Sequence, residues 1–246
     1  MSKIAVICNT LNEFHKAKMG LGVTLRNAGR EFDLFLWDNG SDNDRIKELV
    51  KEFNPKFLHY SEENVGNPVA YNQMLLRAYE DKYDYIAMIA PDIVMPNNWL
   101  ALSEEVYKRG DLKGFLGYDW GYPHTDKTMK LCNNIPLQHS DIVFGCWFFG
   151  RELLDTVGFI NENYKMYGKW DSDWNFRITA SGIESYYLPP MITSIHLTAS
   201  WKDNSTEYRK FKNKWLAVNE KTYTKEVLRY AKEGSYYIAP PKKIEL

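Results

Sequence analysis

The sequence predicts an α/β fold in which a mostly parallel central sheet is flanked by helices. Short apolar runs alternate with amphipathic stretches through the first half of the 246 residues, which is the pattern of repeated β-α units. Such units set their strands in parallel and their helices on both faces of the sheet. Hydrophobic residues make up 44% of the chain and charged residues 26%, so the composition supports a sizeable core in one large domain or two small ones.

Four strands are expected in the first half, each as a short apolar run, at 3–8, 32–37, 57–60 and 85–89. The first is almost entirely apolar, which indicates burial on both faces of the sheet. Apolar periodicity predicts the intervening and following helices at 13–28, 44–53, 69–79 and 99–107. Gly29 stands where the first of these helices should end, and Pro68 suits the first turn of the third.

The second half departs from this rhythm. Strands are expected at 113–118, 142–149 and 185–188, and helices at 151–157 and 170–180, with an irregular segment over 119–140 and two helical patterns within 206–232. We therefore predict one α/β domain over 1–202, divided into a nucleotide-binding half at 1–112 and an acceptor half at 113–202. A C-terminal helical extension is expected over 203–246.

Charge, cysteine content and hydropathy argue against several classes of function. The 31 Lys and Arg against 32 Asp and Glu give a formal net charge of -1, so bulk charge does not favour nucleic acid as a partner. The three cysteines are widely separated, which favours neither a zinc site nor a disulfide framework. No apolar run reaches the roughly 20 residues of a membrane span, and no signal-peptide pattern opens the sequence. We expect a cytoplasmic protein without a transmembrane segment.

Polar residues follow each of the four expected strands of the first half. They are Asn9, Thr10 and Asn12 after the first, Asp38 with the following Asn-Gly-Ser-Asp after the second, Asn64 and Gly66 after the third, and Asp92 after the fourth. Each group alone is typical of turns and helix caps. Ligands of parallel α/β sheets bind at the carboxyl ends of the strands, so the recurrence of these groups at one edge favours a binding site.

Six segments in this order resemble family 2 glycosyltransferases of the GT-A fold, especially their rhamnosyltransferase-like members. The segments are ICNTLNE at 7–13, WDNGSD at 37–42, NVGNPVAYN at 64–72, APDIVMPNNWL at 90–100, VGFINE at 157–162 and WDSDWNFR at 170–177. The resemblance covers roughly residues 3–200. It implies a GT-A fold and transfer of a sugar from a UDP-, dTDP- or GDP-linked donor.

The resemblance also implies a donor site. Asp38 would accept a hydrogen bond from the base, with Asn9 or Thr10 beside it, and Asn12 would also belong to the donor site. Asn64, Gly66 and Asn72 would line the nucleotide. Arg177 would either contact the diphosphate or only pair with an acid. A glycine at position 66 would let the backbone approach the ligand.

By the same resemblance, Asp92 is the last acid of the family's metal-binding motif, and His196 occupies a position used for a C-terminal metal or diphosphate contact. A divalent ion, Mn²⁺ or Mg²⁺, would neutralise the departing diphosphate. Ala90 stands where the first acid of the motif would be, which weakens the expected metal affinity.

Asp171 matches the family's catalytic base, which removes the proton of the acceptor hydroxyl. Trp170 replaces the glutamate that usually precedes it. Asp173 has the simpler interpretation of a carboxylate favoured by the start of a helix. For the acceptor cleft we expect aromatic walls from Trp120, Trp147, Trp170 and Trp201.

The leading hypothesis is an inverting, hexosyltransferase-like enzyme that uses a nucleotide sugar and a divalent metal. The acceptor is unknown, and a modified nucleobase remains among the candidates. Two alternatives stay open. A GT-A-like module could bind a nucleotide or glycan without turnover, because Ala90 and Trp170 depart from the motif. A nucleotidyltransferase ranks last, because 9–13 lacks the glycine-rich loop that such enzymes carry after the first strand.

Overall fold

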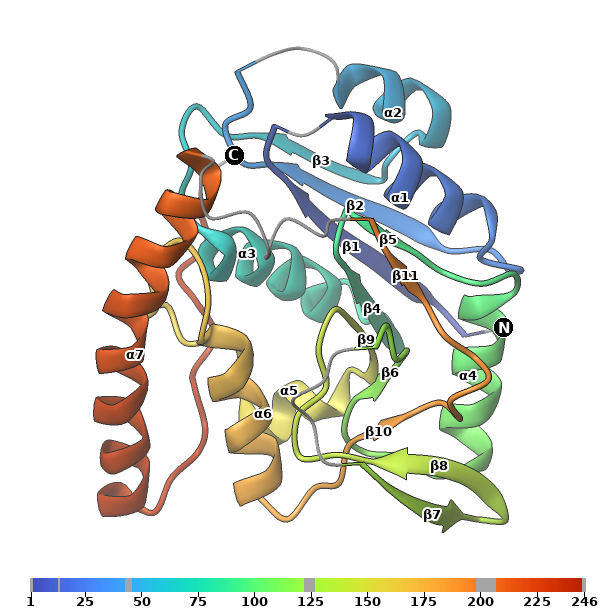
Figure 1. The fold of residues 1–246 in the computed structure, drawn as a ribbon, viewed down its shortest axis with the longest axis vertical. Coiled ribbons are helices and arrows are strands. Elements are labelled where there is room, and N and C mark those ends of the chain that lie inside the picture. The colour runs from blue at the N-terminus through green and yellow to red at the C-terminus, as the bar shows by residue number, and fades with distance from the viewer. Residues whose placement is uncertain (1, 13, 43–45, 122–126, 198–206, 245–246) are drawn as a thin grey trace.

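The computed structural model describes residues 2–12, 14–42, 46–121, 127–197 and 207–244 (Figure 1). Within these residues the centre is a nine-stranded sheet with the order β3-β2-β1-β4-β9-β6-β10-β8-β7. Its strands are β1 (Ile4–Thr10), β2 (Asp33–Asp38), β3 (Phe57–Tyr60), β4 (Tyr85–Ile89), β6 (Leu116–Gly117), β7 (Thr128–Cys132), β8 (Ile135–His139), β9 (Cys146–Gly150) and β10 (Tyr186–Tyr187). The predicted α/β class is confirmed.

The first half is built as the sequence predicts. The strands β3, β2, β1 and β4 are parallel, and β1 is buried along its whole length between β2 and β4. The helices of this half are α1 (Phe14–Arg26), α2 (Ile46–Phe53), α3 (Asn67–Glu80) and α4 (Trp99–Arg109). Right-handed crossovers set α1 and α2 on one face and α3 on the other, because the chain steps outward through β1, β2 and β3 and then returns to β4.

The second half extends the sheet with mixed directions. β9 runs antiparallel to β4, and the short strands β6 and β10 continue the sheet beyond it. The helices here are α5 (Glu152–Val157), α6 (Trp170–Ala180) and α7 (Glu207–Glu233). Figure 1 shows α7 standing beside α6 at the edge of the molecule, on the side opposite α4. None of the helices that the structure describes has the length and apolarity needed to cross a bilayer.

The segment 119–140 is not wholly irregular, as the sequence led us to expect. β7 and β8 form an antiparallel hairpin in it, joined by Asn133 and Asn134, which have φ angles of 47° and 66°. Two positive φ angles are what a tight hairpin turn requires, and asparagine tolerates them. The Asn-Asn pair between strand-length segments was therefore a turn signal in the sequence.

Three other elements differ from expectation. The strand expected at 142–149 begins only at Cys146, because Asn175 of α6 binds both the backbone N–H and the C=O of Val143. The strand expected at 113–118 is reduced to Leu116–Gly117. The two helical patterns expected within 206–232 form the single helix α7.

Most of the aromatic content fills the core. Trp174 of α6 is fully buried, with Phe115 and Phe149 edge-on to its ring at centroid distances of 5.1 and 5.6 Å. On the other flank of α6, Tyr230 of α7 is also fully buried and donates a hydrogen bond to Asp173 of α6. This layer of aromatic side chains fixes α6, and so fixes where its N-terminal end lies.

Candidate active site

The sheet reverses its strand order between β1 and β4, two parallel neighbours with Cys8 opposite Ile89. From β1 the chain builds toward β2 and β3 on one side, while β4 leads to β9 on the other. Such a reversal creates a crevice at the carboxyl ends of the two strands, because the connections that follow them run in opposite directions. The segments following β1 and β4 therefore define the candidate site.

Asp38 ends β2 and is fixed by its own surroundings. Its side chain is 4% exposed, and Oδ1 accepts hydrogen bonds from Thr10 Oγ1 at 3.2 Å and from Ser41 Oγ at 2.5 Å. The backbone N–H of Ser41 donates to Oδ2 at 3.3 Å. The structure thus gives Asp38 and Thr10 a mutual structural role at this edge, and base recognition by either remains a prediction.

Asn12 joins the loop after β1 to the loop after β2. It has a positive φ of 48°. Its backbone N–H donates to Ser41 Oγ at 2.8 Å, and its Nδ2 donates to Asp42 Oδ2 at 3.1 Å. Its amide group is therefore used to align two loops.

Asn9 presents an unsatisfied acceptor at the same edge. Its side chain is 7% exposed, and Nδ2 donates to Asn67 Oδ1 at 3.0 Å. Its Oδ1 is buried and has no hydrogen-bond partner within the described residues. Leaving a buried acceptor unpaired costs about 1–3 kcal/mol, so a hydrogen-bond partner is expected for this atom. This observation fits the predicted position of Asn9 beside a base.

Tyr71 of α3 connects the two sides of the crevice. Its side chain is 6% exposed, and its ring packs against Trp170 with centroids 5.5 Å apart. Burial raises the pKa of Tyr71 well above its ordinary value, with smaller contributions from Cys8 and from Asp92. Tyr71 therefore lies within electrostatic range of the residues that follow β4 while it contacts the start of α6.

Asp92 and His196 come together although they are far apart in the sequence. β5 (Ile93–Val94) follows Asp92, and β11 (Ile195–His196) pairs with it in an antiparallel register that sets His196 opposite Ile93. The backbone N–H of Leu197 also donates to the C=O of Asp92 at 2.8 Å. As a result His196 Nε2 lies 3.6 Å from Asp92 Oδ2, with the two side chains 23% and 18% exposed.

This pair suits a divalent ion. A carboxylate oxygen and an imidazole nitrogen are both ligands for such ions, and 3.6 Å is close to the spacing of two ligands of one metal. No third His, Cys, Asp or Glu joins them to form a cluster in the described part of the chain. The remaining ligands would then be water and phosphate oxygens, which is how Mg²⁺ is usually held.

Asp171 is the second residue of α6 and is half-buried. Burial raises the pKa of its carboxyl above the ordinary value, against the opposing effects of the Ser172 backbone N–H, which donates to Oδ1 at 2.8 Å, and of Lys169. A carboxylate with a raised pKa accepts a proton more readily than an exposed one. The surroundings of Asp171 therefore suit the predicted role as a base, which remains a prediction.

Two of the four predicted aromatic walls are largely buried, and their contact with an acceptor stays a prediction. Trp147 and Trp170 are each 5% exposed, and their rings pack together with centroids 5.5 Å apart. Trp120 is half-buried, and its ring lies 4.8 Å from the ring of His196. Trp201 lies outside the described residues.

Arg177 was expected either to contact a diphosphate or only to pair with an acid, and the structure shows it paired with an acid. The side chain is fully buried and pairs with Asp173 at 2.9 Å. Its guanidinium also donates to the backbone oxygens of Val157 and Phe159. Asp173 in turn accepts from Tyr164 at 3.0 Å. Asp173 is structural, as expected, but it serves as the centre of a buried ion pair rather than as a carboxylate at an exposed helix end.

Asn72 is likewise a core residue. It is 1% exposed, its Nδ2 donates to the Ile160 C=O and to Glu162, and its Oδ1 accepts the Ile160 N–H. These bonds join α3 to the loop before α6 and use both amide hydrogens and one of the two acceptor positions of Oδ1. The structure thus gives Asn72 a structural role, and its contact with a nucleotide stays a prediction.

Asn64 and Gly66 shape the entry to α3. Asn64 Oδ1 accepts the Gly66 N–H at 2.9 Å, which closes a tight turn. Gly66 has φ 91° and ψ 155°, and a Cβ built on it would lie 2.8 Å from the Met166 backbone nitrogen. Glycine is thus required at position 66 because the backbone of Met166 lies against it. The proposed contacts of both residues with a nucleotide remain predictions.

Sequence reasoning missed two residues of this edge, Asn67 and Tyr71. Asn67 binds Asn9, and its backbone N–H donates to the Met166 C=O at 2.9 Å. Tyr71 lies one helical turn further along α3. Both belong to the segment 64–72, and the i, i+4 spacing that sets them on one face of the helix was the signal available in the sequence.

No protein-family model matches the chain, and neither does any curated protein sequence. Solved structures do match. GalNAc-T7 with UDP, GalNAc and Mn²⁺ superposes with a TM-score of 0.62 at 12% identity, over 80% of this chain and 44% of that one. TarS of S. aureus gives 0.61 at 15%, over 80% and 37%. The mannosyltransferase PcManGT from Pyrobaculum calidifontis, in complex with GDP-Man and Mn²⁺, gives 0.59 at 16%, over 79% and 56%.

These similarities establish a GT-A-type fold for the chain. At identities of 12–16% they do not transfer the reaction of any neighbour. The chain also spans only 37–56% of the length of the structures it matches. The donors and Mn²⁺ named with those structures are therefore properties of those proteins.

Proposed function

We propose that the chain is a glycosyltransferase that moves a sugar from a nucleoside-diphosphate donor to an acceptor hydroxyl, with a divalent metal ion. The observation that carries the proposal is the approach of Asp92 and His196 to 3.6 Å at the carboxyl end of β4. The sequence resemblance independently assigns both residues to a metal or diphosphate contact. Their meeting depends on the pairing of two short strands, which no local sequence pattern enforces.

Three sets of residues would have separate roles in the reaction: binding the base, holding the metal ion and removing the proton. Asn9 would receive the base through its unpaired Oδ1. Asp92 and His196 would hold an Mn²⁺ or Mg²⁺ ion, which when bound neutralises charge on the diphosphate. Asp171 would take the proton of the acceptor hydroxyl as its oxygen bonds to the anomeric carbon and the bond to the diphosphate breaks. Such a single displacement inverts the configuration at that carbon.

The finer assignments rest on the sequence resemblance alone. They are the rhamnosyltransferase-like subgroup, the hexosyltransferase type and the choice among UDP, dTDP and GDP. The nature of the acceptor is open. A cytoplasmic location likewise remains a prediction.

The test begins with the donor. UDP-, dTDP- and GDP-sugars are titrated by calorimetry with and without Mn²⁺, and release of nucleoside diphosphate is followed in parallel. At least one donor should bind more tightly with Mn²⁺ present. We expect Asp92→Asn and His196→Ala to lower that metal-dependent affinity at least about tenfold, because each removes one of the two protein ligands.

His139→Ala and Asp141→Asn are the matched controls, because this His-Asp pair lies 3.8 Å apart on and beside β8, away from the crevice. They should leave donor affinity unchanged. The proposal is overturned if no nucleotide sugar binds at millimolar concentration. Binding without release of nucleoside diphosphate would instead favour a binding module, and pyrophosphate release from a nucleoside triphosphate would favour a nucleotidyltransferase.

A further inference from the structure

α7 carries a continuous row of lysines on one exposed face. Successive members of the row are three or four residues apart, and this spacing aligns them along the helix. We call this set the lysine row, and it consists of Lys210, Lys214, Val218, Lys221, Lys225, Leu228 and Lys232. From its first to its last member the row extends about 33 Å at 1.5 Å per residue.

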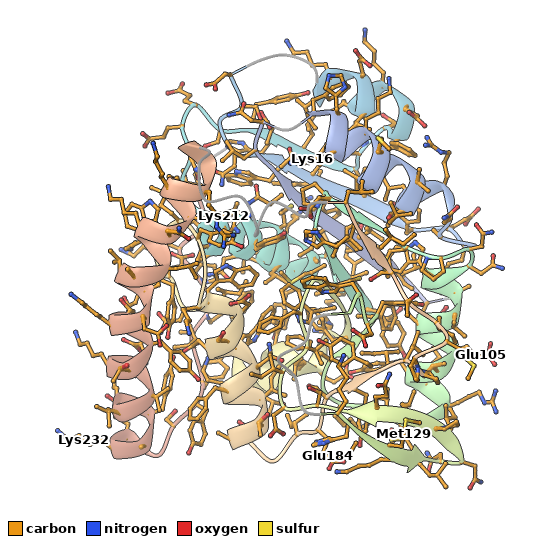
Figure 2. All side chains as sticks on the ribbon, in the orientation of Figure 1. Lys16, Glu105, Met129, Glu184, Lys212 and Lys232 are labelled. Carbon is orange, nitrogen blue, oxygen red and sulfur yellow. The ribbon has the colours of Figure 1, made fainter. Side chains whose placement is uncertain are left out.

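Every member of the lysine row is exposed. Leu228 is 66% exposed and Val218 42%, so the row also presents two aliphatic side chains to solvent. Figure 2 shows Lys232 pointing away from the body of the protein, whereas Lys212 lies on the inner side of α7. The inner side instead buries Asn219, Glu226 and Tyr230.

The row concentrates positive charge on a nearly neutral molecule. The chain has a formal net charge of -1, yet α7 contains eight Lys and Arg against four Glu. Glu220 pairs with Lys169 at 2.6 Å, and Glu233 pairs with Arg229 at 2.7 Å, so these acids are engaged off the row. Among the described residues no ion pair involves Lys214, Lys221, Lys225 or Lys232.

We propose that the lysine row docks α7 flat on the surface of an anionic lipid bilayer. A straight, single-signed row matches the negative potential of a plane of lipid headgroups, and its two aliphatic members would enter the headgroup boundary. A nucleic acid fits less well, because base and backbone readers rely on arginine and on exposed aromatic side chains, and the row has neither. This docking is independent of the proposed reaction.

The test uses vesicles of phosphatidylcholine with and without about 30% phosphatidylglycerol, with protein binding measured by co-sedimentation at low salt. We expect binding to the anionic vesicles only, and its loss at about 0.5 M salt through screening. Each lysine near such a surface contributes about fivefold. The variant Lys214→Gln/Lys221→Gln/Lys225→Gln/Lys232→Gln should therefore bind at least about a hundredfold more weakly, while the corresponding four Lys→Arg changes should retain binding.

The matched control removes the same charge from scattered exposed positions, as Lys51→Gln/Lys82→Gln/Lys113→Gln/Lys243→Gln. It should bind vesicles within about threefold of the unchanged protein, since these lysines share no face with the row. Leu228→Gln should bind anionic vesicles more weakly than the unchanged protein, because an aliphatic contact with the headgroup boundary is lost. Thermal unfolding of each variant checks that the fold is kept.

Equal loss of binding in the row variant and the scattered control would overturn the proposal, because net charge alone would then explain it. Absence of binding to anionic vesicles would overturn it too. Tighter binding to a short DNA duplex than to anionic vesicles at the same salt would assign the row to a nucleic acid instead. Donor binding is measured separately, so its failure does not bear on these outcomes.

Discussion

Asp171 and Asp173 lie two residues apart at the start of α6 and have opposite surroundings. Asp173 is fully buried, with Arg177, Tyr164 and Tyr230 bound to its carboxylate. The hydrogen bonds to the Asp171 carboxyl come only from its own backbone and from the neighbouring Ser172. We expect Asp173→Asn to destabilise the protein by about 3–5 kcal/mol, because it leaves the Arg177 charge buried without its partner.

Asp171→Asn should have the reverse profile, with no loss of stability but a fall in turnover of several orders of magnitude at unchanged donor affinity. Urea unfolding and steady-state rates of the two variants check both expectations. A stability loss in Asp171→Asn as large as in Asp173→Asn would contradict a catalytic position for Asp171.

The raised pKa of Asp171 also fixes how stability varies with pH. The folded protein holds this proton more tightly than the unfolded chain, whose Asp pKa is about 3.9. Below about pH 4 both states are protonated and the group has no effect. As pH rises from there through the folded-state pKa, the unfolded chain gains by ionising first, so the folded state loses stability.

Asp171→Asn removes this pH-dependent loss of folding stability, because asparagine does not ionise. The difference in unfolding free energy between the variant and the unchanged protein should therefore be near zero at about pH 3.5, grow in favour of the variant as pH rises, and then level off. Unfolding in urea from pH 3.5 to 8 measures it. A difference that does not vary with pH would show that the pKa of Asp171 is ordinary.

The sequence located residues better than it assigned them. Asp92 and His196 were singled out by the resemblance to the glycosyltransferase motif, and the structure brings their side chains to 3.6 Å, while their metal role stays a prediction. Arg177, Asn72 and Trp170 fit the same motif but are buried. Whether an arginine or an asparagine of a motif faces a ligand or the core depends on how α6 and α3 are rotated against their neighbours, and one sequence does not contain that information.

At the scale of an element, the turn before α3 depends on Gly66. An alanine there would be held at φ 91° with its Cβ 2.8 Å from the Met166 backbone nitrogen. We expect Gly66→Ala to destabilise the protein by more than the roughly 1–3 kcal/mol of backbone strain alone. Gly182→Ala is the matched control, because Gly182 has φ 75° with nothing within 4 Å.

Thermal or denaturant unfolding of both variants measures the difference. Gly182→Ala should cost about 1 kcal/mol. Equal losses in the two variants would mean that the contact with Met166 does not constrain the turn.

The regular elements of the first half could be predicted because each has a local signal, either an apolar run or helical periodicity. β6 and β10 lie inside the strands expected at 113–118 and 185–188 but are shorter. β5 and β11 could not be predicted, since each is only two residues long. Their strand conformation comes from pairing with partners distant in the chain, and propensity over two residues is too weak to reveal it. The β7–β8 hairpin is an intermediate case, because its turn had a readable signal.

At the scale of the whole molecule, α7 is connected to the crevice through the loop before α6. Asn219 of α7 is fully buried, and its Nδ2 donates to the C=O groups of Lys165, Tyr167 and Gly168. Met166 within this loop accepts a hydrogen bond from the backbone of Asn67. Asn67 in turn binds Asn9, so a chain of contacts runs from α7 to the end of β1.

We therefore expect Asn219→Ala to act at a distance. It should destabilise the protein by about 1–3 kcal/mol, because buried carbonyls lose their donor, and it should also weaken donor binding. Calorimetry and urea unfolding measure the two effects. Asn213→Ala, an exposed position on the same helix, is the control. Weaker binding in the control as well, or unchanged binding in Asn219→Ala, would rule out this connection.

The pairing of β5 with β11 sets an order of events during synthesis. The residues of β5 leave the ribosome long before those of β11, so the parallel strands β3-β2-β1-β4 can assemble while Asp92 still lacks its imidazole neighbour. A nascent chain that has not yet extended past β11 has only one of the two side chains that meet there. Any ligand requiring both is therefore captured late, after the second half has been translated.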